Sequence, residues 1–243
     1  MLLKVWNDEK PDYLAVAFDV GKTFRDDIYA EYKGTRQKMP AELSQQMKRI
    51  TQVVNALGIA TFTAEGFEAD DVLGTLSRRA AGEGLDVVIV TGDRDALQLV
   101  NPAIKVLTSG RFFDQTVVYD EAKVLERYGV RPDQMIDYKA LLGDKSDNVP
   151  GVSGIGEKSA QSLLEQYTTL DGVYAHLDDV QKRARTALEA GKDSAYLSRT
   201  LVTIRTDVPI EVDWEACRAQ VDYPRTLALF RELEFASLIK RIP

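Results

Sequence analysis

The sequence predicts an α/β fold with a mostly parallel sheet, followed by a helical section. Three observations predict it. Short apolar runs alternate with amphipathic segments in the first half, carboxylates follow the ends of those runs, and the pattern becomes helical from Tyr119 onward. A chain of 243 residues with 44% apolar content can bury a substantial core. We therefore expect an α/β core over residues 1–119 and a helical part over residues 120–243.

Local signals predict each element of the α/β core. The apolar runs 13–18 and 86–90 are typical of buried strands in a parallel sheet. Pro40 opens a helix whose apolar residues recur at helical spacing, and Gly58 closes it. A second helix is expected over residues 69–81. This alternation of strands and helices favours a sheet covered by helices.

The helical part contains a helix-hairpin-helix pattern at about residues 133–167. Helices are expected over residues 121–128, 133–142 and 157–167, and a glycine-rich loop separates the last two. Glycines there let the backbone approach a phosphate, and amides at the start of the next helix can bind it. A glycine-rich surface turn is the alternative interpretation. The residues expected to contact DNA are Gly151, Gly154, Gly156, Lys158 and Ser159.

Carboxylates are concentrated beside the predicted strand ends. Several converging carboxylates repel one another and are costly to bury, so they usually need bound cations. Because the chain has one His and one Cys, hard oxygen ligands indicate Mg²⁺ or Mn²⁺, and two such ions can hydrolyse a phosphodiester. An acidic first helical turn is the alternative for the cluster at 68–71. The candidate metal ligands are Asp19, Glu68, Asp70, Asp71, Asp93, Asp95, Asp144 and Asp147.

Composition limits the class of protein. The formal net charge is −7, yet residues 22–49 are locally basic and could follow a phosphate backbone. Charges interrupt the apolar residues at the start of the chain, so neither a secretory leader nor a membrane span is indicated, and a cytoplasmic location is expected. Cys217 is the single cysteine, which excludes an internal disulfide.

Six motifs in a fixed order carry a family resemblance. They are FD at 18–19, YKGTR at 32–36, GFEADD at 66–71, TGDRD at 91–95, LGDKSDNVPG at 142–151 and GIGEKSA at 154–160. Together they resemble the 5′→3′ exonuclease domain of bacterial DNA polymerase I, a member of the flap endonuclease superfamily, from Leu2 to Pro243. The resemblance implies a PIN-like flap-nuclease core and a helix-hairpin-helix section.

The resemblance also implies an activity and roles for residues. A structure-specific 5′ nuclease of DNA replication and repair is expected, acting on a 5′ flap, a nick or a 5′ end. The acidic residues match the family's ligands for two Mg²⁺ (or Mn²⁺) ions, and the hairpin matches a K⁺ site. Lys33 and Arg36 match basic residues of an arch segment at about 21–40, and Arg25 is assigned with them to the catalytic set. A DNA polymerase acting in trans is an expected partner.

The chain departs from the family at its beginning. Family members start with a further strand that ends in an aspartate and supplies a metal ligand, and the segment before Leu2 is absent here. Two alternatives to the nuclease therefore stay open. One is a structure-specific DNA-binding module with impaired catalysis, and the other is a PIN-like ribonuclease.

Overall fold

The computed structural model describes residues 1–36, 40–109 and 116–243. These residues form two compact units, each with its own core. Unit 1 comprises Met1–Gly21, Gln37–Val72 and Val208–Pro243, and unit 2 comprises Lys22–Arg36 and Leu73–Asp207. Within the described ranges, no helix is both long and apolar enough to span a membrane.

Unit 1 is built on two short parallel strands and helices from both ends of the chain. Strand β1 (Ala15–Ala17) pairs with β2 (Ala60–Phe62) in the register Ala15↔Ala60. The helices, which include the first turn of α4, are α1 (Leu2–Glu9), α3 (Ala41–Ala56), α4 (Ala69–Gly82), the 3-10 helix η4 (Glu215–Cys217), α11 (Tyr223–Glu232) and α12 (Ala236–Ile239).

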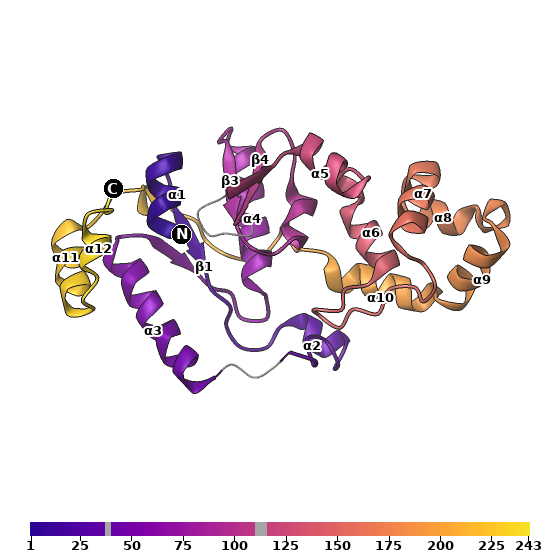
Figure 1. Cartoon of the computed structure of the whole chain (residues 1–243), viewed down its shortest axis with the longest axis horizontal. Coiled ribbons are helices and arrows are strands. Elements are labelled where there is room, and N and C mark those ends of the chain that lie inside the picture. The colour runs from indigo at the N-terminus through magenta and orange to yellow at the C-terminus, as the bar shows by residue number, and fades with distance from the viewer. Residues whose placement is uncertain (37–39, 110–115) are drawn as a thin grey trace. The chain divides into compact units, whose positions relative to one another are not determined.

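The core of unit 1 joins α3 to the C-terminal helices. Helix α11 packs against the C-terminal end of α3 (Figure 1), where the Thr226 hydroxyl donates to the Ala56 carbonyl at 2.8 Å. Phe230 is 1% exposed and belongs to the same buried cluster as Val54. By contrast, Leu43 and Ile50 on α3 are 42% and 44% exposed. The rest of unit 1 therefore leaves some apolar side chains of α3 uncovered.

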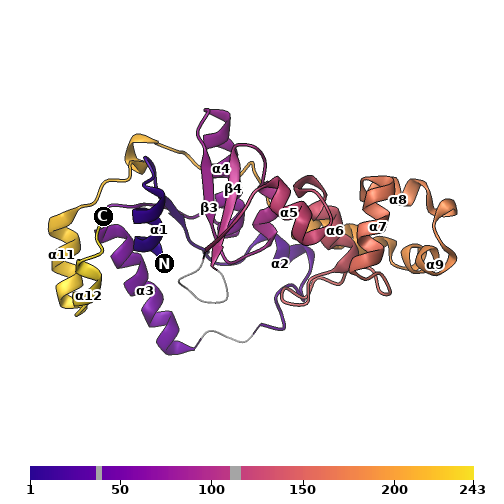
Figure 2. The same cartoon turned by 45° about the horizontal axis from the view of Figure 1, so that its top comes forward.

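Unit 2 combines a three-stranded sheet with a helical group. Strand β3 (Val87–Val90) is parallel to β4 (Ile104–Ser109), and β5 (Thr116–Tyr119) is antiparallel to β4. Figures 1 and 2 show α4 alongside β3 and β4. The remaining elements of this unit are α2 (Phe24–Ile28), η1 (Asp95–Leu99), α5 (Glu121–Tyr128), η2 (Pro132–Gln134), α6 (Met135–Leu142), α7 (Glu157–Tyr167), α8 (Leu170–Ala175), η3 (Leu177–Asp179), α9 (Lys182–Ala190) and α10 (Lys192–Val202).

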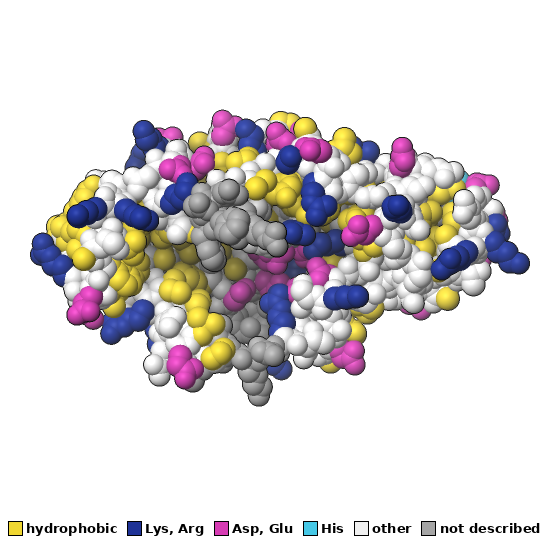
Figure 3. Space-filling view, viewed as in Figure 1, with side chains coloured by type: hydrophobic (Ala, Val, Ile, Leu, Met, Phe, Trp, Pro, Cys, Tyr) yellow, Lys and Arg dark blue, Asp and Glu magenta, His cyan; other side chains and the backbone are white. Residues whose placement is uncertain are grey.

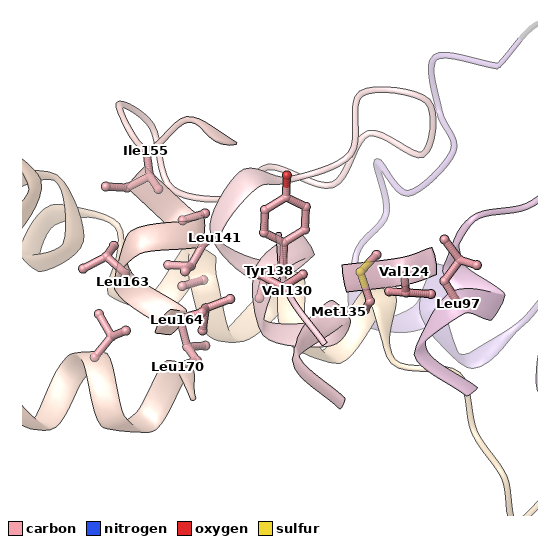
Figure 4. Packing of buried hydrophobic residues seen from close by; sticks show 14 of the residues in the cluster. Leu97, Val124, Val130, Met135, Tyr138, Leu141, Ile155, Leu163, Leu164 and Leu170 are labelled. Carbon is pink, nitrogen blue, oxygen red and sulfur yellow. The ribbon is translucent and has the colours of Figure 1, made fainter. Parts of the chain in front are cut away.

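Among the described residues of unit 2, buried side chains form two clusters; the smaller joins Tyr32 and Val149 to the end of α10, and the larger forms the main core. The larger cluster runs from η1 through α5 and α6 to α7 and α8, as Figure 4 shows for residues such as Leu97, Leu141 and Leu164. Leu141 and Leu164 have no exposed surface. Because α6 is buried against both α7 and α10, the loop that follows α6 leaves from a fixed point. That loop carries two of the candidate ligands.

The structure confirms the predicted fold class and most predicted elements. The expected helix 121–128 is α5, the expected helix 157–167 is α7, and the expected helix 133–142 is η2 followed by α6. Strands β2, β4 and β5 and helix α1 were not predicted. The division at residue 119 stays a prediction, and residues 37–39 of the expected arch segment lie outside the described residues.

Candidate functional site

The first acidic group lies at the N-terminus of α4 in unit 1. Asp19 follows β1, and its Oδ1 accepts a hydrogen bond from the Ala69 amide at 2.7 Å. Asp71 Oδ2 accepts from the Glu68 amide at 3.0 Å, so Asp71 caps its own helix. Asp71 is fully buried and Glu68 is 8% exposed. The structure thus brings Asp19 to the 68–71 cluster, where helix amides stabilise the carboxylates.

The second acidic group lies in unit 2 around a lysine that the sequence analysis did not name. Lys139 of α6 forms ion pairs with Asp95 Oδ1 and, at 3.0 Å, with Asp144 Oδ2. Its side chain is 16% exposed, so the ion pairs are largely shielded from water. The signal that could have identified Lys139 is a lysine in the otherwise apolar second half of the helix entering the GDKSDN loop.

The loop after α6 is fixed by its own backbone. The amide and carbonyl groups of Asp144 and Val149 exchange hydrogen bonds of 2.9 and 2.8 Å. Gly143 and Gly151 both have positive φ, and a Cβ on Gly151 would lie 2.2 Å from the Gly143 nitrogen. Such a close approach requires glycine. Asp144 and Asp147 are therefore held in a rigid turn.

Burial and neighbouring charges set the acidity of this group. Burial raises the pKa of Asp93 above its ordinary value. The ammonium groups of Lys139 and Lys33 act to lower this pKa, and the carboxylates of Asp147 and Asp144 act to raise it. Burial also acts to raise the pKa of Asp144, but hydrogen bonds from Ser146 and the charge of Lys139 together bring it below its ordinary value. Asp93 thus lies close enough to these neighbours to be influenced by them.

Asp147 faces the basic residues of the segment before residue 37. Its side chain pairs with Arg36 and lies 3.8 Å from Lys33 Nζ. The Lys33 amide donates to the Asp147 carbonyl at 2.9 Å, and Asn148 Nδ2 donates to the Glu31 carbonyl at 2.7 Å. Two of the predicted basic residues are therefore brought to one of the predicted ligands.

Arg25 occupies a different position. It is 2% exposed, and its guanidinium donates to the carbonyls of Leu201 and Thr203, both at 2.7 Å. These carbonyls lie at the C-terminal end of α10, where the helix leaves acceptors without intrahelical donors. These hydrogen bonds of Arg25 anchor α2 to α10, and its assignment to the catalytic set stays a prediction.

The hairpin residues divide into a buried and an exposed set. Gly151 is buried, with its amide donating to Ser198 Oγ at 2.9 Å and its carbonyl accepting from Ser194 Oγ at 2.7 Å. Four others are exposed around the start of α7: Gly154, Gly156, Lys158 and Ser159. Over the helical group α7–α9, Figure 3 shows Lys and Arg side chains singly rather than as a continuous basic band.

The acidic residues fit a hard divalent cation by the chemistry of their donors. Every member supplies carboxylate oxygens, the donors that Mg²⁺ and Mn²⁺ prefer. Asp95 Oδ1 is buried without a hydrogen bond and lies against the Lys139 ammonium. In the described part of the chain, no three carboxylate, imidazole or thiolate groups are close enough together to share a metal ion. Lysine and arginine side chains neutralise the second group in this arrangement.

Comparison with known families places the chain. Residues 1–129 match a family model described as 5′-3′ exonuclease, N-terminal resolvase-like domain, and residues 130–224 match 5′-3′ exonuclease, C-terminal SAM fold. The chain belongs to the 5′-3′ exonuclease family. This confirms the resemblance inferred from the six motifs. The two models meet at residues 129/130, within the turn after α5.

Relatives of this 5′-3′ exonuclease family member are longer proteins. The chain is 50% identical to DNA polymerase I of Chloroflexus aurantiacus over all of its own length and 26% of that protein. It is 41% identical to DNA polymerase I of Bacillus subtilis, again over its whole length and 28% of the relative. The chain therefore spans about a quarter of the length of these relatives.

Solved structures share the fold. A structure of T5 5′-exonuclease with bound divalent zinc ions has a TM-score of 0.69 at 22% identity, covering 96% of this chain and 88% of that one. The catalytic core of Rad2 in complex with a DNA substrate has a TM-score of 0.62 at 15% identity, covering 100% of this chain and 81% of that one. At such identities the likeness concerns the fold.

Proposed function

We propose that this chain is a structure-specific 5′ nuclease of DNA replication and repair, which hydrolyses DNA phosphodiester bonds at a 5′ flap, a nick or a 5′ end. The observation that carries the proposal is the second acidic group of unit 2. There, Asp95 and Asp144 share Lys139, and Asp147 faces Lys33 and Arg36. Family membership and relatives that are DNA polymerases support it.

The mechanism assigns separate tasks to the acidic and basic residues. The candidate carboxylates would hold two divalent cations, Mg²⁺ or Mn²⁺. When bound, these cations would activate a water molecule and stabilise the leaving oxygen. Lys33 and Arg36 would then meet the charge of the scissile phosphate, since they already lie beside Asp147, one of the proposed ligands. Arg25 would act by holding α2 against α10.

DNA binding is assigned to the hairpin and the start of α7. Amides at a helix N-terminus bind phosphate without reading sequence, and Lys158 and Ser159 are exposed on the first turn of α7. We assign a K⁺ ion to backbone carbonyls of residues 151–156. A DNA polymerase is the proposed protein partner, because the curated relatives are DNA polymerases of greater length.

One observation favours a second candidate function. The carboxylates of the second group are neutralised by Lys139 and Arg36 in this arrangement. A chain that kept these ion pairs in solution would bind structured DNA without cutting it. The second candidate is therefore a DNA-binding module without catalysis.

Cleavage of a 5′-labelled DNA flap tests the proposal. We expect cutting with Mg²⁺, none with EDTA, and a loss of about 100-fold or more in Asp93→Asn/Asp95→Asn, because the second acidic group loses two of its four carboxylates. Asp133→Asn is the matched control, since Asp133 is an acidic residue of unit 2 with a side chain 68% exposed. Flap binding without cutting would establish the DNA-binding module, and preferential cutting of single-stranded RNA would establish a PIN-like ribonuclease.

A further inference from the structure

A cavity of about 440 Å³ opens beside the second acidic group, wholly within unit 2. The loop after β3, α5, α6 and the first two turns of α7 line it, and Asp93 and Asp144 stand at one side. Its volume falls in the range of small-molecule sites, roughly 300–1,000 Å³. It is much larger than a metal ion or a phosphate group requires.

Two arginines meet at one tyrosine of this cavity. The Arg127 guanidinium lies 5.4 Å from the centre of the Tyr128 ring, and Arg94 lies beside the Tyr128 hydroxyl. Within the described ranges, neither arginine forms an ion pair with a carboxylate. The Tyr128 hydroxyl is buried without a hydrogen bond of standard geometry. Two like charges at one ring repel each other, so this side of the cavity favours an anion.

The rest of the lining is mixed: Lys139, Ser146, Glu157 and Gln161 contribute polar groups, and Tyr138, Met135 and Leu142 contribute an aromatic ring and aliphatic surface. Tyr138 is 5% exposed, and its ring meets that of Tyr128 edge to face, with the centres 6.5 Å apart. Figure 4 shows the Tyr138 hydroxyl pointing away from the buried aliphatic side chains of its cluster. Met135 and Leu142 add apolar surface to the lining. A ligand that fills the cavity therefore needs an anionic group and a larger, partly apolar body.

We infer that this cavity binds the 5′-terminal nucleotide of the DNA as a deoxynucleoside 5′-monophosphate unit. Its phosphate pairs with Arg94 and Arg127, while its sugar and base lie against Tyr138 and Leu142. The identity of this nucleotide as the end of a DNA strand rests on the proposed function. The affinity of the cavity for a nucleoside monophosphate does not, because it requires no cleavage.

The geometry also points to a role in the choice of product. A nuclease that seats the terminal nucleotide beside its acidic group can release mononucleotides one at a time. Cutting within a flap needs no terminal nucleotide in the cavity. Arg94 and Arg127 are thus specificity-determining residues for removal of the 5′-terminal nucleotide.

Binding of free nucleotides tests the site directly. Deoxyadenosine 5′-monophosphate, deoxyadenosine and inorganic phosphate are titrated by calorimetry into the full chain in EDTA. The monophosphate should bind about 10-fold or more tightly than either of the others, since charge-assisted hydrogen bonds and apolar contacts both contribute. Equal affinity of monophosphate and nucleoside would overturn the anion site. Equal affinity of monophosphate and phosphate would overturn the nucleotide assignment.

Variants locate the site. Arg94→Gln/Arg127→Gln should weaken monophosphate binding by about 10-fold or more. Both side chains are exposed at the rim, so their replacement leaves the core intact. Arg131→Gln is the matched control, because Arg131 is an exposed arginine outside the cavity that pairs with Asp133. A double variant that binds the monophosphate as tightly as the control does would refute the inference.

Cleavage products separate this inference from the proposed function. On a nicked duplex with Mg²⁺, the double variant should lose release of mononucleotides about 10-fold while retaining flap cleavage. If wild type cuts both substrates and the double variant cuts both equally well, the cavity has no role in product choice and the inference fails. If wild type cuts neither substrate, the proposed function fails. The calorimetric titrations then still show whether the cavity binds a nucleoside monophosphate.

Discussion

At the scale of single residues, Lys139 stabilises the folded arrangement of the acidic side chains of unit 2. Its ammonium lies between Asp95 and Asp144, and its side chain is 16% exposed. Removing one partner of a shielded ion pair leaves the remaining charge without compensation, which costs more than the pair itself contributes. The carboxylates therefore need Lys139 whenever no other cation neutralises them.

Replacing Lys139 should expose this dependence. We expect Lys139→Gln to lower the free energy of unfolding in EDTA by about 2–4 kcal/mol, measured by urea denaturation. The deficit should shrink when Mg²⁺ is added, since a bound divalent cation neutralises the same carboxylates. Lys123→Gln, at a lysine 43% exposed and paired with Glu126, should change stability much less, because solvent screens an exposed ion pair. Equal losses in the two variants would show that Lys139 does not stabilise the acidic group.

The backbone of the turn after α6 depends on Gly151 in the same way that the acidic group depends on Lys139. Its φ is +65°, and an added Cβ would collide with the backbone of Leu142 and Gly143. Gly151→Ala should therefore lower the free energy of unfolding by about 3 kcal/mol or more, because strain and a backbone clash add. Gly84→Ala is the matched control, since Gly84 has φ +83° with nothing within 4 Å of the added Cβ. It should lose only about 1–2 kcal/mol, so similar losses would mean that the turn relaxes around the new methyl group.

Sequence reasoning at this scale found what a residue can do but not what it touches. The aspartates after strands were visible because a carboxylate following an apolar run is unusual in itself. Lys139 was not, because its importance depends on Asp95, which is 44 positions away in the chain, and only folding brings the two together. Arg25 was identified by resemblance, yet in the structure its guanidinium donates to carbonyl groups at a helix end.

At the scale of elements, local signals predicted helices better than strands. Helices α5 and α7 have the bounds that the sequence predicted, and Asp120 caps α5, with its side chain accepting from the Lys123 amide at 2.8 Å. Strands β2, β4 and β5 are 3 to 6 residues long and lack a clear alternation of polar and apolar positions. Pairing with a neighbour defines such strands, and pairing is absent from a local pattern. Helix α1 was hidden because charges surround its buried Val5 and Trp6.

The contact between α2 and α10 yields a prediction at this scale. Arg25 supplies donors to two carbonyls near the end of α10, and Gln98 supplies another to the Val202 carbonyl at 2.9 Å. Arg25→Gln should lower the free energy of unfolding by about 2–4 kcal/mol and increase amide hydrogen exchange in α2 and at the end of α10, because buried carbonyls lose their donors.

Arg183→Gln, at an exposed arginine of α9, is the control and should leave exchange in α2 unchanged. A loss of DNA cleavage in Arg25→Gln without any change in stability or exchange would contradict the anchoring role. It would then favour direct contact of Arg25 with the substrate.

At the scale of the whole molecule, the two compact units are interleaved along the chain. Unit 1 draws on three separate segments, including the last 36 residues from Val208 to Pro243, and unit 2 draws on two. The expected division at residue 119 stays a prediction. Sequence composition follows the chain, whereas a core forms between whichever segments meet, as Phe230 does with Val54 in unit 1.

The two cores yield the prediction that tests this partition. Phe230→Ala and Leu164→Ala each remove a side chain at most 1% exposed, one from each core, and should each cost about 2–5 kcal/mol. Amide hydrogen exchange should then rise in different places, because a cavity weakens the packing of its own unit first. Phe230→Ala should affect residues 1–21, 40–72 and 208–243, although these lie far apart in the chain. Leu164→Ala should affect residues 22–36, 73–109 and 116–207. If both variants raised exchange uniformly along the chain, the two cores would unfold as one cooperative structure, and the partition would have no energetic meaning.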